Sequence, residues 1–273
     1  MDRFTDITQQ VEKLGETAAC LATGLLSVDK LCGGLPRGGV TVLGSRPGMG
    51  GTSFALSLIH QIAQRQTGNI LIFSPRLRRH ELTARLLEVG MGAPLAALLD
   101  SSLPKDSLQP TLQSLQASIH TETLTSPTLE NILHRVARMP KLQLLVIDGI
   151  ECICRPVDYE TKDICFTDQP ESFENSLRCL KGIATSMNIP VLCTHHLHRS
   201  LENRQNKRPK LTDLKRKRLP EELADQVFFL YRDRYYDWEG DDAAECIVAK
   251  TPSGTTGTAF LAWNPQIGKF QDL

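Results

Sequence analysis

Residues 45–53 combine glycines and hydroxyl side chains in the order typical of a phosphate-binding loop. The apolar run 40–43 predicts a strand before them, and the apolar density of 54–59 predicts a buried helix after them. A strand, a glycine-rich turn and a helix N-terminus together present backbone N–H groups that bind phosphate. The residues that we expect to contact a nucleotide are Ser45, Gly48, Met49, Gly50, Gly51, Thr52 and Ser53.

This loop lacks the lysine of the motif. The pattern ends in Gly-Lys followed by Ser or Thr, whereas this chain has Gly50, Gly51 and Thr52. The lysine supplies the positive charge that meets the terminal phosphates of a nucleotide. The loop therefore predicts weak binding of ATP or ADP with Mg²⁺, and impaired hydrolysis.

Composition and charge exclude several classes of protein. The 273 residues carry 31 basic and 31 acidic side chains, so any attraction to nucleic acid must be local. The hydrophobic content of 41% is ordinary for a globular protein with a core, and the longest apolar runs have the length of a strand, which predicts no membrane span. Eight cysteines form no Cys-x-x-Cys pair, and residues 1–5 lack the pattern of a secretory signal. We therefore expect a cytoplasmic protein with reduced cysteines.

Predicted strands and helices alternate along the chain. We expect strands at 40–43, 69–74, 142–148, 190–194 and 226–231, and helices at 54–59, 81–89, 128–138 and 172–188. Strands at 246–250 and 256–263 are expected to form a C-terminal β-hairpin at the edge of the sheet. This order predicts an α/β fold, with a mostly parallel twisted sheet and helices on both faces. Residues 5–14 have helical spacing, and 154–169 and 199–218 are expected to be loops inserted into one domain.

In their order along the chain, several tracts resemble the C-terminal motor domain of the bacterial replicative DNA helicase, the DnaB family. The entry tract is 24–35 and the phosphate loop is 46–55, and the strand that ends in Asp148 is similar to the metal-binding strand of the family. Tracts within 199–214, 224–236 and 249–266 continue the resemblance to the end of the chain. One tract alone would be weak, but the ordered set is highly specific.

The resemblance implies a RecA-like P-loop NTPase core in residues 21–273, preceded by a linker helix in residues 1–20. The primase-binding domain of the family has no match in the chain. The resemblance also implies binding of single-stranded DNA, a role in DNA replication, and a homo-oligomeric ring or intact helicase subunits as partners.

Four side chains on which hydrolysis depends in the family are replaced. By position, Gly51 replaces the phosphate-loop lysine, and Arg76 replaces the glutamate that orients the attacking water. His196 replaces the glutamine that senses the terminal phosphate, and Pro252 replaces the arginine that reaches into the adjacent subunit's site. An arginine finger contributes about 10³–10⁵ in rate and a positioned base about 10²–10⁴. We therefore predict a degenerate motor with no intact catalytic residue.

Other parts of the family's site are retained. Thr52 and Asp148 are the oxygen ligands expected for magnesium. Arg85 resembles a family arginine near the phosphates, and Lys250 remains as the other residue offered to a neighbouring subunit. The adjacent cations Arg76, Arg78 and Arg79 could replace part of the missing lysine charge.

A basic run occupies 199–218. Its basic residues are Arg199, Arg204, Lys207, Arg208, Lys210, Lys215, Arg216, Lys217 and Arg218, against the acidic Glu202 and Asp213. In the family, a loop of this region lines the ring's channel and contacts DNA phosphates. We therefore expect Arg199, Lys215, Arg216, Lys217 and Arg218 to bind the single-stranded DNA backbone in a salt-dependent manner. A solvated charged loop is the alternative.

Two clusters of metal-type ligands are expected to be structural. His195, His196 and His198 are poorly placed to chelate one ion together, because adjacent strand residues point to opposite faces. Cys152, Cys154 and Cys165 fit no common zinc spacing.

Three other functions stay open. The first is a working ATP-dependent 5'-3' DNA helicase that uses substitute residues such as Arg76 and Lys250. The second is a RecA- or RadA-like recombination or clock-type ATPase. The third is an interaction protein without a DNA role.

Overall fold

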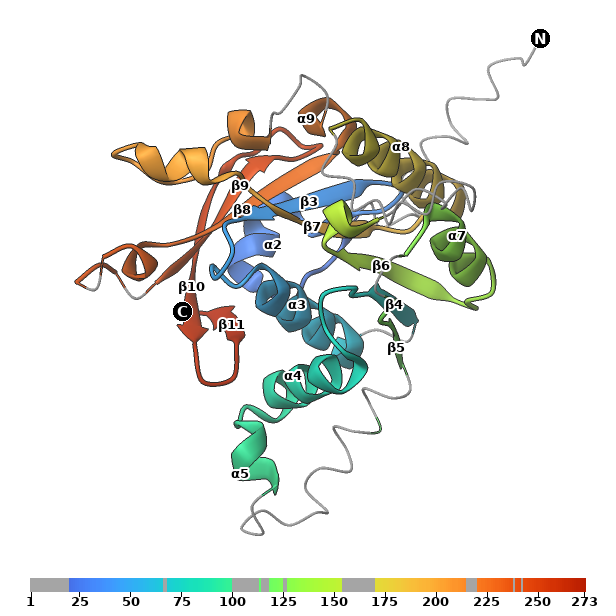
Figure 1. Ribbon diagram of the computed structural model, residues 1–273, viewed down its shortest axis with the longest axis horizontal. Helices are drawn as coiled ribbons and strands as arrows, with labels where there is room; N and C mark the ends of the chain where they lie inside the picture. The colour runs from blue at the N-terminus through green and yellow to red at the C-terminus, as the bar shows by residue number, and fades with distance from the viewer. Residues whose placement is uncertain are drawn as a thin grey trace, which may run out of the picture.

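A computed structural model describes residues 20–65, 68–99, 113, 118–124, 127–153, 170–214, 220–237, 239–241 and 243–273. These residues form a nine-stranded sheet in the order β11-β10-β9-β8-β3-β7-β6-β4-β5, with helices against both of its faces (Figure 1). The α/β fold predicted from the alternation of strands and helices is confirmed. The helix expected at 5–14 lies outside the described residues.

Six of the described strands run parallel in the middle and at one side of the sheet. They are β3 (Val40–Ser45), β4 (Asn69–Phe73), β5 (Ile119–Glu122), β6 (Leu142–Asp148), β7 (Val191–His196) and β8 (Gln226–Arg232). Because parallel strands end at the same edge, the segments that follow β3, β4, β6 and β7 meet there. Ligands of open α/β sheets bind at that carboxyl edge.

Three antiparallel strands extend the sheet beyond β8: β9 (Ala244–Lys250), β10 (Gly257–Asn264) and β11 (Lys269–Asp272). β9 and β10 form the hairpin expected from the sequence, and β11 adds an outermost strand. β5 and β11 were not predicted, because four residues are too few to show a clear alternation. A separate two-stranded sheet joins β1 (Cys20–Leu21) to β2 (Leu35–Pro36).

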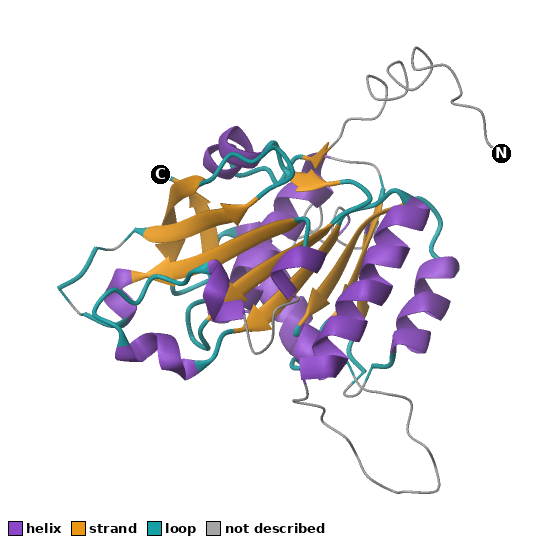
Figure 2. Cartoon of the chain, turned by 90° about the horizontal axis from the view of Figure 1, so that it is seen from above, coloured by secondary structure: helices purple, strands orange, loops and turns teal. Residues whose placement is uncertain are grey.

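Two hydrophobic cores lie on opposite faces of the sheet, and helices cover both faces (Figure 2). One is covered by α2 (Leu26–Cys32), α3 (Gly51–Arg65) and α4 (Arg79–Met91), and the other by α7 (Leu129–Ala137) and α8 (Pro170–Met187). Successive residues of β6 divide between them, with Leu144 and Val146 in the first core and Leu145 and Ile147 in the second. A strand buried on both faces reads as an unbroken apolar run, which is why this strand was predictable.

Short elements connect these layers. They are α5 (Leu95–Leu99), α9 (Pro220–Leu223) and the 3-10 turns η1 (Ile150–Cys152), η2 (Arg199–Asn203), η3 (Leu211–Leu214) and η4 (Asp233–Tyr235). None of the described helices combines the length and hydropathy needed to traverse a bilayer.

The C-terminal strand is joined to α2 by one carboxylate. Asp272 Oδ2 accepts a hydrogen bond from Leu26 N at 2.7 Å, and Oδ1 accepts one from Ser27 N at 2.9 Å. These two N–H groups belong to a helix start, where the helix itself supplies no acceptor. Burial raises the pKa of Asp272, but the hydrogen bonds from Ser27 and Leu26 outweigh it, so the pKa lies below its ordinary value.

We expect Asp272→Ala to lower the free energy of unfolding by about 1 kcal/mol at neutral pH, as the loss of a helix cap does. A carboxylate with a lowered folded pKa stabilises the fold above its unfolded pKa, and the contribution is lost as the pH falls through the folded value. The difference between the two proteins should therefore narrow below about pH 3.9. Urea unfolding between pH 7 and pH 3 measures it, with the exposed Gln271→Ala as the matched control. A difference that stays constant over this range would contradict the assignment.

Candidate nucleotide-binding site

The segment between β3 and α3 has the backbone shape of a phosphate-binding loop. β3 ends at Ser45 and α3 begins at Gly51. Gly48 and Gly50 have φ angles of +82° and +98°, a region that favours glycine. Phe54 N donates to Gly50 O at 2.8 Å and closes the loop onto the helix. The N–H groups of the first helical turn point to the space where an anion would bind.

Ser45 fills the space beside Gly51. A Cβ on Gly51 would lie 2.6 Å from Ser45 Oγ, which is closer than two such atoms approach in proteins. Ser45 is 2% exposed, so its side chain has little room to turn away. The glycine at position 51 is therefore accompanied by a hydroxyl group at the end of β3 that occupies the space of a Cβ atom.

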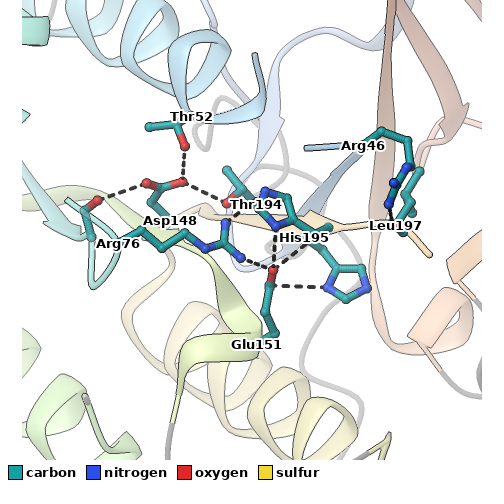
Figure 3. Close-up of polar contacts among 10 residues, drawn as sticks. Arg46, Thr52, Arg76, Asp148, Glu151, Thr194, His195 and Leu197 are labelled. Atoms are coloured by element: carbon teal, nitrogen blue, oxygen red, sulfur yellow. Dashed lines mark hydrogen bonds and ion pairs between the residues drawn. The ribbon is translucent and has the colours of Figure 1, made fainter. Parts of the chain in front are cut away.

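The Asp148 carboxylate accepts hydrogen bonds from three hydroxyl groups that belong to three parts of the fold (Figure 3). Oδ1 accepts from Thr52 Oγ1 of α3 and Thr194 Oγ1 of β7, and Oδ2 accepts from Ser74 Oγ after β4, each at 2.9 Å. Asp148 is 3% exposed, so these hydroxyls replace the water that a buried carboxylate needs. Ser74 and Thr194 were not predicted site residues. Ser74 directly follows β4, and Thr194 lies near the end of β7, so both are at the carboxyl edge of the sheet.

Thr52 and Asp148 lie together as the sequence predicted, and they fit a magnesium ion. Both offer oxygen, the ligand type that magnesium prefers. In the described part of the chain, no group of three His, Cys, Asp or Glu side chains is placed to hold a metal by itself. An ion at Thr52 and Asp148 would therefore need water and phosphate oxygens as its other ligands, which is the usual arrangement for magnesium.

Arg76 enters the same site from the segment after β4. Its guanidinium forms an ion pair with Glu151 of η1, and its Nη1 lies 3.2 Å from His196 Nε2 (Figure 3). Its Cζ lies 2.9 Å from where a Cβ on Gly149 would be, so it rests on the backbone next to Asp148. The position where the family resemblance implies a proton-accepting glutamate therefore holds a partly buried cation.

Two histidines complete the surroundings of Glu151. Glu151 Oε2 lies 3.4 Å from His195 Nδ1, and Oε1 lies 3.5 Å from His196 Nδ1. His195 stacks on Phe173 of α8, with 4.4 Å between ring centroids, whereas His196 faces Arg76. The rings thus diverge, as expected for adjacent strand residues, although both reach the same carboxylate.

The charges of this cluster fix its protonation. Burial raises the pKa of Glu151, but the hydrogen bond and charge of His195, together with the charge of Arg76, lower it to about 2. Burial and the charge of Arg76 lower the pKa of His196. At neutral pH the cluster therefore contains an ionised Glu151, a charged Arg76 and a neutral His196.

The family of this chain follows from a comparison of its sequence with models of protein families. The model of the DnaB-like helicase C terminal domain matches residues 20–272. The chain belongs to this family. Replicative DNA helicase DnaB of Geobacillus stearothermophilus is 30% identical over 262 residues, which cover 93% of this chain and 56% of the relative. Replicative DNA helicase DnaC of Bacillus subtilis is 29% identical over 279 residues, which cover 99% of this chain and 60% of the relative. The chain thus spans less than two thirds of the length of these relatives.

Two solved structures share the fold of this DnaB-like domain. The first is a DnaB-like replicative helicase, described with its interactions with primase. It has a TM-score of 0.82 and 23% sequence identity, and the match covers 100% of this chain and 68% of that chain. The second is described as an ATPase domain. It has a TM-score of 0.83 and 24% sequence identity, and the match covers 98% of this chain and 96% of that chain. The RecA-like fold implied by the sequence resemblance is thereby confirmed.

Two cations of this DnaB-like domain, one in the phosphate loop and one at the opposite edge of the sheet, are held by other protein groups. Arg46 Nε lies 2.8 Å from Glu202 Oε1, and its Nη1 donates to Leu197 O at 2.7 Å. Lys250, which the resemblance offers to a neighbouring subunit, donates to Ala224 O at 2.6 Å within its own chain. Arg46 therefore ties the phosphate loop to η2, at the start of the basic run.

A third cation is bonded to carbonyl groups of the phosphate loop and was not a predicted site residue. Arg232 donates to Gly48 O at 2.6 Å and to Met49 O at 3.1 Å, and its guanidinium carbon lies 4.8 Å from the centroid of the Trp263 ring. Tyr235 OH donates to Pro47 O at 3.2 Å. Arg232 ends the strand beside β3, so the shared edge of the sheet was a signal that could have identified it.

Three other residues considered in the sequence analysis are exposed on the surface. Arg85 is exposed on α4, and Pro252 is exposed after β9. Arg78, which was considered a substitute cation, pairs instead with Glu81 at 2.6 Å on the surface. The roles assigned to Arg85 and Pro252 stay predictions.

Part of the basic run is folded against its own acidic partners. Arg204 Nη2 lies 2.8 Å from Asp213 Oδ2, and Arg208 Nη2 lies 2.6 Å from Glu245 Oε1 on β9. These pairs position η2 and η3 on the sheet. They also reduce the charge that the run can offer to DNA.

The cations with the strongest predicted role in DNA binding are differently placed. Arg199 is exposed at the start of η2. Lys215, Arg216, Lys217 and Arg218 lie outside the described residues. Their contact with DNA stays a prediction.

The contact between Ser45 and Gly51 gives a stability prediction. Alanine exceeds glycine in helix propensity by about 1 kcal/mol, but forcing the Ser45 side chain from its rotamer costs about 0.5–1.5 kcal/mol. We expect Gly51→Ala to stabilise the domain in a Ser45→Ala background and to give little or no gain in the native background. Urea unfolding of the four proteins measures this coupling.

A matched control is available on α8, where a Cβ on Gly182 would meet no atom within 4 Å. Gly182→Ala should stabilise both backgrounds equally. Equal effects of Gly51→Ala in the two backgrounds would show that Ser45 does not restrict position 51.

Proposed function

We propose that this DnaB-like domain binds ATP or ADP with magnesium on the loop before α3, and that it hydrolyses ATP very slowly or not at all. The proposal is carried by the Arg76–Glu151 pair, which puts a cation at the position of the implied proton acceptor. A guanidinium stays protonated at physiological pH, so Arg76 cannot take a proton from an attacking water. Gly51 supplies no charge to offset that loss.

Glu151 is a poor substitute for the missing base. Its pKa of about 2 is far from the operating pH, and an effective general base has a pKa near that pH. Its carboxylate is also occupied by Arg76 and lies near two histidines. These contacts support a binding site in preference to a hydrolytic one.

We further propose an accessory or regulatory role in DNA replication, because the curated relatives are replicative helicases. The domain would join a homo-oligomeric ring or intact helicase subunits, with residues 1–20 as the linker helix to a neighbour and residues 21–273 as the RecA-like unit. Since the chain covers 56% and 60% of two of those relatives, their full activity is not carried over. The described interaction with primase belongs to the solved relative.

A working ATP-dependent 5'-3' helicase is the second candidate. The observation that favours it is the intact contact between Thr52 and Asp148, with Arg76 beside it as a possible source of positive charge. The two candidates differ in whether the domain turns over ATP.

We expect the purified domain to release phosphate from ATP far below about 1 per second, the lower end of ordinary enzyme turnover. The reason is that neither Arg76 nor Glu151 can act as the base. Phosphate release with Mg²⁺ and single-stranded DNA measures turnover, and binding of a fluorescent ATP analogue measures nucleotide affinity. Turnover of about 1 per second or more, retained after further purification, would favour the working helicase.

A restored site provides the companion measurement. Gly51→Lys needs Ser45→Ala to remove the close contact, and Arg76→Glu needs Glu151→Gln because two neighbouring carboxylates would repel each other. We expect any recovered hydrolysis to be larger in this fourfold variant than in one that keeps Glu151. Failure of both would show that positions beyond these four have also lost their catalytic arrangement.

We also expect salt-dependent binding of single-stranded DNA through Lys215–Arg218. Replacement of the four cations by alanine should lower the slope of log affinity against log salt by about 3, since each phosphate contact contributes about 0.7. Fluorescence anisotropy with an unspecific oligonucleotide over a salt series measures the slope. Arg208→Gln is the contrasting variant, because its charge is already paired with Glu245; it should reduce stability and leave the slope nearly unchanged. A slope unaltered by the fourfold replacement would remove this loop from the proposed DNA contact.

A further inference from the structure

We propose that Arg76 is the residue by which this domain distinguishes a nucleoside triphosphate from a diphosphate, and that Glu151 is the positioning residue that holds the Arg76 guanidinium there. The inference rests on the proposed nucleotide binding and specifies which phosphate the site reads. It assigns Arg76 a recognition role in place of the catalytic one that its position implies.

The path of the Arg76 side chain is the first support. Arg76 follows β4, which is separated from β3 by β6 and β7. Its guanidinium nevertheless returns to β7, where Nη1 lies 3.2 Å from His196 Nε2. His196 is paired in register with Ser45, the last residue of β3. The charge of Arg76 is therefore carried from a distant strand to the strand next to the phosphate loop.

The position along the strands is the second support. The Cζ of Arg76 lies 2.9 Å from where a Cβ on Gly149 would be, so the cation lies against the residue after Asp148. Asp148 is bonded to Thr52 in the first turn of α3. A phosphate chain lying on that turn, with magnesium at Thr52 and Asp148, would extend its last phosphate toward Arg76. A diphosphate ends one phosphate earlier and would not reach it.

The occupation of the neighbouring cations is the third support. Arg46 is bonded to Glu202 and Leu197 O, and Arg232 is bonded to the loop carbonyls Gly48 O and Met49 O. Arg78 is paired with Glu81 on the surface. Of these four cations, Arg76 is the one that lies against Gly149, the residue after Asp148.

Glu151 holds the Arg76 guanidinium in place, but its negative charge also offsets the positive charge of Arg76 at the site. An arginine carries five N–H donors, so a guanidinium held by one carboxylate can still donate to phosphate oxygens. The carboxylate itself repels a phosphate nearby. A neutral amide of the same shape would keep an acceptor for Arg76 and remove the repulsion, so Glu151→Gln should improve binding of the triphosphate.

The test compares affinities for AMP-PNP, a triphosphate that is not hydrolysed, and for ADP, each with Mg²⁺. We expect Glu151→Gln to raise the AMP-PNP affinity more than the ADP affinity. In that background, Arg76→Met should lower the AMP-PNP affinity by about 10- to 100-fold, the effect of one charged hydrogen bond, and change the ADP affinity little. The Glu151→Gln background is needed because Arg76→Met alone would leave an unpaired carboxylate in the site.

Arg78→Met is the matched control, since it removes the same charge from the same segment at a surface pair. It should leave both affinities unchanged, and thermal unfolding confirms that each variant is folded. If an Arg76→Met variant that remains folded keeps the triphosphate preference, the inference is overturned. In that case the proposed nucleotide binding still stands, because the protein binds both nucleotides. If the native protein binds neither nucleotide, the proposed function fails, and the inference that rests on it fails as well.

Discussion

The site depends on one buried carboxylate at the carboxyl edge of a parallel sheet. Asp148 receives hydroxyl groups from Thr52, Ser74 and Thr194, which belong to α3, the end of β4 and β7. A buried carboxylate without such donors would be costly, so these elements are held in one relative position. The start of α3, and with it the phosphate loop, is therefore fixed against the sheet before any nucleotide binds.

The second constraint is that three described cations near the loop are bonded to protein acceptors. Arg46 is bonded to Glu202, Arg232 to the loop carbonyl Gly48 O, and Arg76 to Glu151. A phosphate-loop lysine is different, because its charge is delivered directly to the phosphates. In the described residues, the backbone N–H groups of the loop are thus accompanied by three cations whose charges already have protein acceptors. This arrangement favours binding of a phosphate through its shape and through hydrogen bonds from specific N–H groups, and it provides little long-range electrostatic attraction.

Membership of the DnaB-like family establishes the fold, whereas the chemistry has to be argued from the site. The scaffold that binds phosphate and metal in such a fold is present, in the loop 45–53 and in the contact between Thr52 and Asp148. Beside that scaffold, the cation Arg76 and the anion Glu151 form a pair, with His196 against both. Removing either partner would leave the other charge partly buried and unpaired, so the two side chains depend on each other.

The sequence by itself determined the α/β fold, the family, the phosphate loop and the pair of Thr52 and Asp148. These follow from apolar runs, glycine spacing and ordered tracts, which are local patterns. Only the tertiary structure decided what surrounds them. Arg76 is 75 residues from Glu151, and Arg46 is 156 residues from Glu202. The strands β5 and β11 were too short to recognise. The partner of each charge was also not predictable, because the strand order determines which distant segments meet at the edge of a sheet. No local sequence pattern encodes that order.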